Sequence, residues 1–186
     1  MQPPQASCKR WLQTMAITLT YQLGKSVSVG DTLLSWGTDR EQVRRLLNDK
    51  FEIGDNVVDL SQYNNGNTSK NITQRRDIYK NYRGQDNFFF LNFDANDRLA
   101  EVELHYGFII SINNVKIDFS MAIENVAELL VNISGDKTQL SPGEYFFKDL
   151  KLTIASGFAT DGYGDELSYF YCSKDVSHLV DNEVCR

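Results

Sequence analysis

Cysteine is scarce in this chain of 186 residues, and the placement of the few cysteines excludes two kinds of site. Cys8, Cys172 and Cys185 are odd in number, lie far apart or near the chain ends, and form no CxxC motif. This spacing argues against a disulfide framework and against a zinc site. It also suits a reducing compartment, so we expect a cytoplasmic protein.

Long apolar runs and an excess of positive charge are also missing. No stretch approaches the roughly 18 apolar residues that a membrane span needs, and residues 11–23 are too polar for the core of a signal peptide. The formal net charge is −6. A negative chain disfavours nucleic acids and anionic membranes as partners, and it favours a basic protein partner.

Motifs for catalysis and for cofactor binding are absent as well. The sequence holds no G-x-S-x-G, Walker, GxGxxG or HExxH motif, and its only histidines are His105 and His178. The segment DANDRLAEVE resembles a calcium loop, but Arg98 stands where calcium needs an oxygen ligand, and the next position lacks the required glycine. We therefore predict a protein that is not an enzyme and that binds no metal and no cofactor.

The segment WGTDREQVRRLLND, residues 36–49, has the pattern of a short helix. Thr38 and Glu41 have the spacing of a capping box, in which each side chain accepts a hydrogen bond from the other residue's backbone amide. Val43, Leu46 and Leu47 recur at the spacing of one helix face. Three acidic residues balance the three arginines of this segment, so it does not have the charge of a nucleic-acid-binding helix.

Alternating apolar and polar residues predict strands in several other segments. The first such pattern covers residues 17–23. The segment 88–106 predicts a hairpin around the turn Asp94–Asp97, and the segment 108–119 predicts a second hairpin around Asn113–Asn114.

A second helix is predicted over residues 121–133, with Ser120 as its N-cap and Gly135 just beyond its end. Two further strands follow, over residues 145–155 and 166–173. In the polar insertion 55–86, the segment 72–82 fits either a short helix or an irregular strand.

Together these elements predict an α+β fold, an antiparallel sheet with helices packed on one of its faces. Residues 1–14 are expected to form an irregular extension, and residues 15–186 a single domain. The order of a helix followed by antiparallel strands occurs twice, over 38–119 and over 120–173, which suggests two half-repeats.

Two acidic surfaces lie outside the apolar pattern. One is the solvent-facing side of the second strand in the predicted hairpin 88–106. The other is the loop TDGYGDE, residues 160–166. Such a loop is explained either by solubilising charges or by binding of a cation or a basic protein. An exposed aromatic ring flanked by acids fits protein recognition. The candidate partner-binding residues are Glu101, Glu103, Asp161, Tyr163, Asp165 and Glu166.

The first helix and the first hairpin carry a resemblance to a known family. The matching residues are Gly37, Thr38, Glu41, Val43, Leu46 and Leu47, then Phe93, Asp94, Arg98, Leu99, Val102, Glu103 and Leu104. Over residues 36–130, with an echo at 150–171, the chain resembles bacterial immunity-type proteins, which neutralise toxin domains of polymorphic and contact-dependent growth-inhibition systems. It departs from that pattern in the insertion 55–86. The element order is also similar to that of small periplasmic inhibitor modules.

The resemblance implies a non-enzymatic immunity or inhibitor protein that covers the active site of a cognate toxin domain. If the toxin is a nuclease, its site is basic, and an acidic cover matches its charge. The alternative is a small-ligand-binding or stress-associated module, whose sheet face would form an apolar pocket larger than about 300 Å³. A third hypothesis, a hydrolase, requires His105 or His178 to meet a carboxylate in a cleft.

Overall fold

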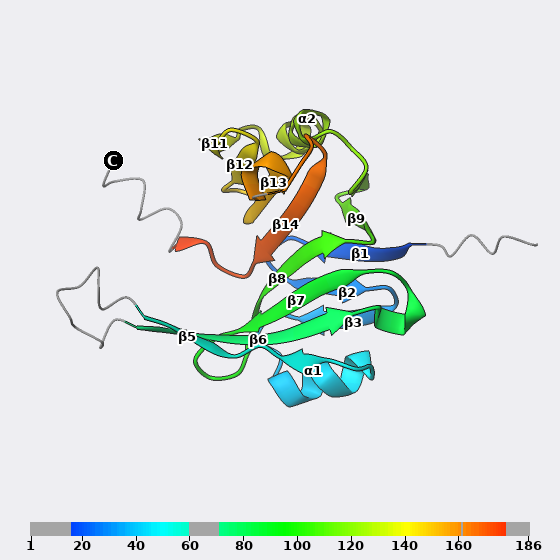
Figure 1. Cartoon of the computed structure of the whole chain (residues 1–186), viewed down its shortest axis with the longest axis vertical. Coiled ribbons are helices and arrows are strands. Elements are labelled where there is room, and N and C mark those ends of the chain that lie inside the picture. Colours follow the sequence, from blue (N-terminus) through cyan, green and yellow to red (C-terminus); the bar gives the residue numbers. More distant parts are fainter. Residues whose placement is uncertain (1–15, 60–70, 161, 178–186) are drawn as a thin grey trace, which may run out of the picture.

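The computed structural model describes residues 16–59, 71–160 and 162–177, which form two β-sheets and two α-helices (Figure 1). The smaller sheet has the strand order β10-β9-β1-β2-β3. It is mixed, because β1 runs parallel to β9 and antiparallel to β2. Its strands are β1 (Ile17–Gln22), β2 (Ser26–Val29), β3 (Thr32–Ser35), β9 (Phe108–Ile112) and β10 (Val115–Asp118).

The larger sheet has the order β11-β12-β13-β14-β8-β7-β6-β4, and β5 also pairs with β6. All pairings among its described strands are antiparallel. Its strands are β4 (Glu52–Ile53), β5 (Asn56–Val58), β6 (Ile72–Lys80), β7 (Phe88–Phe93), β8 (Leu99–Tyr106), β11 (Thr138–Ser141), β12 (Glu144–Phe147), β13 (Leu152–Ser156) and β14 (Leu167–Ser173).

The helices α1 (Arg40–Leu47) and α2 (Ile123–Ser134) lie at opposite ends of the molecule, with the smaller sheet between them (Figure 1). Helix α1 packs against β3, and α2 packs against β10, β12 and β13. Short 3-10 turns, η3 (Tyr82–Gly84) and η4 (Phe158–Thr160), complete the described elements. No helix in the described part of the chain is long and apolar enough to cross a membrane.

The predicted α+β arrangement, with helices as a layer on one face of an antiparallel sheet, is therefore wrong. The fold is largely β, and a second sheet shares the core with the helices. The apolar pattern identifies amphipathic segments, but it does not say which segments pair. The pairing of β1 with β9 joins residues about ninety positions apart, so no local pattern indicated the smaller sheet.

One cluster of buried apolar side chains takes residues from both sheets and from both helices. Most strands supply it from one face, as expected for strands with one buried face, whereas β4, β5 and β11 supply none of its buried residues. Fully buried members include Leu19, Val29, Val43, Leu91, Val102, Leu104, Ile110, Val126, Phe147 and Phe170. Residues 1–14, expected to be irregular, lie outside the described residues.

The local turn predictions are confirmed. Asp94 N–H donates to Arg98 O at 2.9 Å, and Asp97 adopts a φ of +56°. Asn113 and Asn114 adopt φ angles of +47° and +69°, as a two-residue hairpin turn requires. The segment 72–82, for which the sequence allowed a helix or a strand, forms β6 and the start of η3.

The predicted helix caps are wrong at the N-terminal ends. Asp39 is the N-cap of α1, and its carboxylate accepts from Glu41 N–H at 3.1 Å, whereas Thr38 Oγ1 donates to Ser35 O. Leu46, expected in the core, is 44% exposed. Helix α2 begins after Ala122 without a side-chain cap, while its predicted end at Gly135 is confirmed.

The larger sheet has an internal pseudo-twofold relation about its central pair, β8 and β14. In the first half, α1 is followed by β6, β7 and β8; in the second half, α2 is followed by β12, β13 and β14. Strand order outward from the centre is the same on both sides. The register agrees, because Phe170 pairs with Leu104 and Cys172 pairs with Val102.

Backbone hydrogen bonds at the start of each helix repeat this relation. In the first half, Arg40 N–H donates to Asp97 O, and Leu99 N–H donates to Thr38 O, both at 2.9 Å. The second half repeats this pair of bonds, from Ile123 to Asp165 and from Leu167 to Met121. The start of α1 is thus hydrogen-bonded to the residues at the start of β8, and the start of α2 is hydrogen-bonded to the residues at the start of β14.

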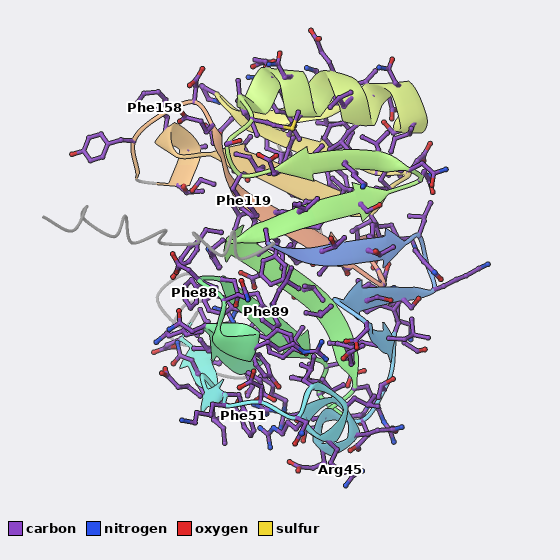
Figure 2. All side chains as sticks on the ribbon, turned by 90° about the vertical axis from the view of Figure 1, so that its right-hand side faces the viewer. Arg45, Phe51, Phe88, Phe89, Phe119 and Phe158 are labelled. Atoms are coloured by element: carbon purple, nitrogen blue, oxygen red, sulfur yellow. The ribbon has the colours of Figure 1, made fainter. Side chains whose placement is uncertain are left out.

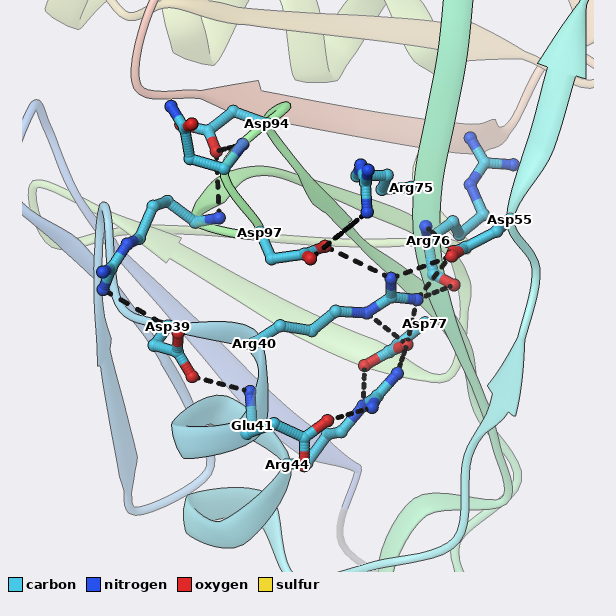
Figure 3. Close-up of polar contacts among 12 residues, drawn as sticks. Asp39, Arg40, Glu41, Arg44, Asp55, Arg75, Arg76, Asp77, Asp94 and Asp97 are labelled. Atoms are coloured by element: carbon cyan, nitrogen blue, oxygen red, sulfur yellow. Dashed lines mark hydrogen bonds and ion pairs between the residues drawn. The ribbon is translucent and has the colours of Figure 1, made fainter.

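Buried charges join α1 to the larger sheet (Figure 3). Arg40 and Arg44 converge from α1 on the fully buried carboxylate of Asp77 in β6, with N···O distances of 2.6 to 3.0 Å. Arg40 also binds Asp55 through two hydrogen bonds, of 2.7 and 3.0 Å. Because every buried charge of this cluster has a partner of opposite sign, we interpret it as a structural junction.

In the second half, the corresponding contact between α2 and the larger sheet contains no buried charge. By the pseudo-twofold relation, Ile123 stands in the place of Arg40, and Tyr145 stands in the place of Asp77. Both second-half residues belong to the apolar core. The Tyr145 hydroxyl donates to Glu124, whose carboxylate raises the pKa of that phenol to about 12.

Candidate functional site

The connection between β13 and β14 is the most conspicuous departure from the pseudo-twofold relation. Five residues, 94–98, join β7 to β8, whereas ten residues, 157–166, join the corresponding strands β13 and β14. The first half shows that a short turn is sufficient for this fold. The additional residues of the 157–166 loop are therefore not required to close the hairpin.

The backbone of the 157–166 loop is hydrogen-bonded to itself. Phe158 N–H donates to Gly164 O at 3.1 Å, and Gly162 N–H donates to Gly157 O at 2.8 Å. At the base, Gly157 N–H donates to Glu166 O at 3.2 Å. These bonds give the loop a defined shape, although it carries only a single 3-10 turn of regular structure.

Glycines permit this close folding. A Cβ atom on Gly157 would lie 2.2 Å from the carbonyl oxygen of Tyr163, so no other residue fits there without moving the backbone. Gly164 has a φ of +94°, which favours glycine. The hydroxyl of Thr160 lies 3.2 Å from that of Ser168 and joins the loop to β14.

The loop presents two large aromatic side chains to solvent. Tyr163 is 96% exposed and Phe158 is 68% exposed, the two largest exposed fractions among the apolar side chains of the described residues. Figure 2 shows Phe158 at the periphery of the molecule, on the loop and away from the core. Aromatic side chains have only two rotatable side-chain bonds, so these rings lose little conformational entropy when a partner covers them.

Two acidic residues follow Tyr163 in the same loop. Asp165 and Glu166 are exposed, and the bond from Ile123 N–H to Asp165 O at 2.7 Å places them beside the start of α2, where Glu124 is exposed. Between residues 108 and 177 the sequence holds ten acidic residues against five lysines and no arginine. This half of the molecule therefore has a negative local potential that suits a basic partner.

Of the six predicted partner-binding residues, the structure brings together three, Tyr163, Asp165 and Glu166. Asp161 belongs to the same segment but lies outside the described residues. Glu101 lies elsewhere, beside Ser173 at the far end of β14. Ser173 is the sixth residue after Leu167 along β14, a distance of roughly 20 Å.

Glu103 is not the free surface acid that the alternating pattern suggested. It is only 8% exposed, and its carboxylate accepts from Arg76 at 2.7 Å and from Asn92. Glu101 accepts a hydrogen bond of 3.1 Å from the same Asn92 side chain. Because Arg76 neutralises Glu103, the 101–103 pair offers less negative charge to a partner than the sequence indicated.

His105 does not form the pair that a hydrolase would need. Its ring lies among Phe88, Phe90 and Tyr169, at centroid distances of 5.0, 4.6 and 5.6 Å. Burial lowers its pKa, and its buried Nε2 has no hydrogen-bond partner among the described residues. The second histidine, His178, lies outside the described residues.

Two surface grooves were also found. One, of about 540 Å³, is lined by Asp49, Lys50, Phe51, Glu52, Ile78 and Lys80. The other, of about 460 Å³, lies at the end of β1 and is lined mainly by polar residues. Both are open to solvent and neither is the apolar pocket on a sheet face that a ligand-binding module would require. Within the described ranges, no group of three or more histidine, cysteine or acidic residues is placed to hold a metal ion.

Comparison with known proteins finds no family, no characterised protein and no solved structure that matches this chain. The resemblance to immunity-type proteins therefore rests on sequence motifs alone.

Sequence reasoning identified Tyr163 and the acids of its loop because glycines and acids flank a single ring. It missed Phe158, which sits in the segment SGFAT without any charge to distinguish it from a core residue. Only the position of this residue outside β13 shows that its ring is exposed.

Proposed function

We propose that this protein is a cytoplasmic immunity or inhibitor protein that binds a basic cognate toxin domain and blocks its active site. The observation that carries the proposal is the 157–166 loop, a self-bonded extension that the fold does not need and that exposes Tyr163 and Phe158. Central aromatic anchors of this kind supply most of the binding energy in many protein interfaces.

The acidic surroundings of the loop support a basic partner. Asp165 and Glu166 follow Tyr163 in the loop, and the chain as a whole carries a net charge of −6. Complementary charge speeds association and disfavours other acidic proteins as partners. A nuclease domain, whose active site attracts phosphate, is the toxin class that fits this surface best.

A genetic and kinetic experiment tests the proposal. We expect the gene directly upstream to encode a large secreted protein with a variable C-terminal toxin domain. Co-expression with the present protein should rescue cells from that domain, and the purified pair should form a complex. Tyr163→Ala should raise the dissociation rate by about tenfold or more, because a buried aromatic anchor contributes at least 1 to 2 kcal/mol in typical interfaces.

Leu33→Ala is the matched control, because Leu33 is also an exposed apolar residue but lies on β3 of the smaller sheet. Its dissociation rate should equal that of the parent protein. The proposal fails if no toxic domain is encoded upstream. It also fails if Tyr163→Ala and Phe158→Ala both bind that domain as tightly as the parent does.

A further inference from the structure

The one parallel strand pair among the described strands ends at a groove in the smaller sheet. Strands β1 and β9 lie side by side and run in the same direction, with Thr20 opposite Ser111 and Tyr21 opposite Ile112 (Figure 1). Beyond these residues the chain turns towards β2 on one side and towards β10 on the other. In open α/β sheets, parallel strands whose connections diverge leave a crevice at their carboxyl ends, where ligands bind. The same divergence opens a groove here.

This groove has a volume of about 460 Å³, and both turns contribute to its walls. Leu23 and Lys25 come from the turn between β1 and β2, and Asn113 and Asn114 come from the turn between β9 and β10. The first turn is closed by a hydrogen bond of 3.0 Å from Lys25 N–H to Gln22 O. The volume falls in the usual range of small-molecule sites, roughly 300–1,000 Å³.

The floor of the groove is polar. Ser111, Thr20 and Gln22 lie on the solvent-facing side of β9 and β1, because the residues that alternate with them are buried in the core. The hydroxyls of Ser111 and Thr20 make no hydrogen bond with another described residue. The side-chain oxygen of Gln22 accepts from Ser26 Oγ at 3.2 Å, so the amide nitrogen of Gln22 is free to donate.

The charge at this groove is positive, although the chain as a whole is acidic. Lys25 is the only charged residue that lines it, and it forms no ion pair with another described residue. Lys116 is exposed and pairs with Ser111, so a second lysine lies beside the groove on the same face of the sheet. Two residues further along β10, the Asp118 carboxylate accepts hydrogen bonds from the backbone and side chain of Ser120. An anionic ligand therefore fits this groove, whereas the groove beside β4 combines two lysines with two acidic residues.

We propose that this groove binds a small polyhydroxylated anion, a sugar acid or a sugar phosphate. Lys25 pairs with the anionic group, as charge-assisted hydrogen bonds are the strongest available to a site of this kind. The side-chain amides of Asn113 and Asn114 each offer donors and an acceptor, and a sugar hydroxyl offers both as well. The inference does not depend on the proposed function, because the groove lies on the smaller sheet and the 157–166 loop joins strands of the larger one.

Titration of the isotope-labelled full chain tests this inference, with backbone amide chemical shifts as the readout. The probes are glucose 6-phosphate, gluconate, glucose and inorganic phosphate, each added at neutral pH and low salt. We expect saturable shifts at Lys25, Asn113 and Asn114 with at least one of the two sugar anions, which also identifies the anionic group. Glucose and inorganic phosphate should each bind about tenfold more weakly or less, because each lacks one part of the recognised chemistry.

Three variants locate the binding. Lys25→Gln removes the charge of the groove and should weaken binding of the sugar anion by about tenfold or more. Ser111→Val covers the floor with an apolar side chain that suits a strand, and it should abolish binding. Lys50→Gln is the matched control, because Lys50 is an exposed lysine that lines the other groove, and this variant should bind as the parent does. All three variants should keep the parent melting temperature, since the altered side chains lie outside the core.

Three results would overturn the inference. The first is the absence of saturable shifts at both turns with either sugar anion. The second is a Lys25→Gln variant that binds the sugar anion as tightly as the parent protein does. The third is inorganic phosphate that binds as tightly as the sugar anions, because the groove would then hold an adventitious ion only.

Discussion

At the scale of single residues, Asp77 is the buried carboxylate on which two arginines of α1 converge. Its carboxylate has no exposed surface and is bound by two arginines, Arg40 and Arg44. The hydrogen bond to Asp77 raises the pKa of Arg44, and both guanidinium groups stay charged. If the carboxylate is removed, two positive charges stay close together in a site with little access to water.

Asp77→Ala should therefore lower the free energy of unfolding by about 3–5 kcal/mol, as in other cases where a buried ion pair loses one partner. Asp55→Ala should cost much less, about 1 kcal/mol or below, because the Asp55 side chain is 38% exposed and water can replace it. Urea denaturation of both variants provides the measurement. Equal losses of stability for the two variants would contradict the buried role of Asp77.

His105 gives the protein a pH dependence of known sign. Burial lowers the pKa of His105 in the folded state below its value in the unfolded chain. The unfolded state therefore binds the proton more readily, and stability decreases as the pH falls from about 6.5. The partners that face the ring, Glu103 and Arg76, act in opposite directions on this pKa.

His105→Phe should reduce the loss of melting temperature between pH 7 and pH 5, since the aromatic contacts with Phe88 and Phe90 can be kept. His178→Gln serves as the control, and the parent pH dependence should persist in it. Thermal melts across this pH range decide the matter. An unchanged slope in His105→Phe would show that its burial is not linked to protonation.

At the scale of elements, the sequence predicted what local chemistry controls and missed what distant pairing controls. Asn113–Asn114 and Gly135 were assigned correctly because these residues tolerate a positive φ better than most others. The smaller sheet was missed because it is held together by the pairing of β1 with β9, two strands that lie far apart in the sequence. Burial of Arg40 was missed because its position in the helix was judged from charge, and Asp77 reaches it from 37 residues away.

The start of α1 is a local feature that the sequence suggested incompletely. Thr38 fits a capping box by spacing, but the helix begins one residue later and Asp39 provides the cap. Asp39→Ala should therefore cost about 1 kcal/mol of stability, the usual value for a lost N-cap. Thr38→Ala, which removes only the bond to Ser35 O, should cost less in the same denaturation series. A larger loss of stability in Thr38→Ala than in Asp39→Ala would show that Thr38 is the cap.

The contacts of α1 and of α2 with the larger sheet use different residues at equivalent positions, so the residues of one can be exchanged for those of the other. The apolar junction of α2 uses Ile123, Ala127 and Tyr145 at the places that Arg40, Arg44 and Asp77 occupy in the first half. Replacement of a buried ionic cluster by apolar residues of suitable shape is often neutral or stabilising. The ionic junction is thus not a requirement of this architecture.

The triple variant Arg40→Ile, Arg44→Ala, Asp77→Tyr should fold with a free energy of unfolding equal to that of the parent or higher. The single variants should each be less stable, since each leaves an unpaired charge or an unfilled space. In the triple variant Asp55 loses its two hydrogen bonds from Arg40, so the backbone amides of β4 and β5 should exchange with solvent faster. A triple variant less stable than all three single variants would refute the correspondence of the two junctions.

At the scale of the whole molecule, the two pseudo-equivalent halves carry different additions. The first half has the β5–β6 extension with exposed apolar side chains, and the second half has the acidic, aromatic 157–166 loop. Sequence composition indicated the loop, because charge and glycine are visible without a structure. The exposure of Ile53, Val57 and Ile72 could not be predicted, because these residues look like core residues until the strand order is known.

The acidic charge of the second half leads to the last prediction. The double variant Asp165→Asn, Glu166→Gln should slow association with a basic toxin domain and make the rate less sensitive to salt, because charges at the rim of an interface act mainly on encounter. Glu128→Gln, Asp136→Asn removes the same net charge at other exposed positions of the same half and is the matched control. Association rates at low and high salt, measured for both double variants, separate a local effect from a general one. If both slow association equally, net charge alone attracts the partner and the loop is not at the rim. If only the loop variant does so, Asp165 and Glu166 lie close enough to the bound toxin to steer it onto Tyr163.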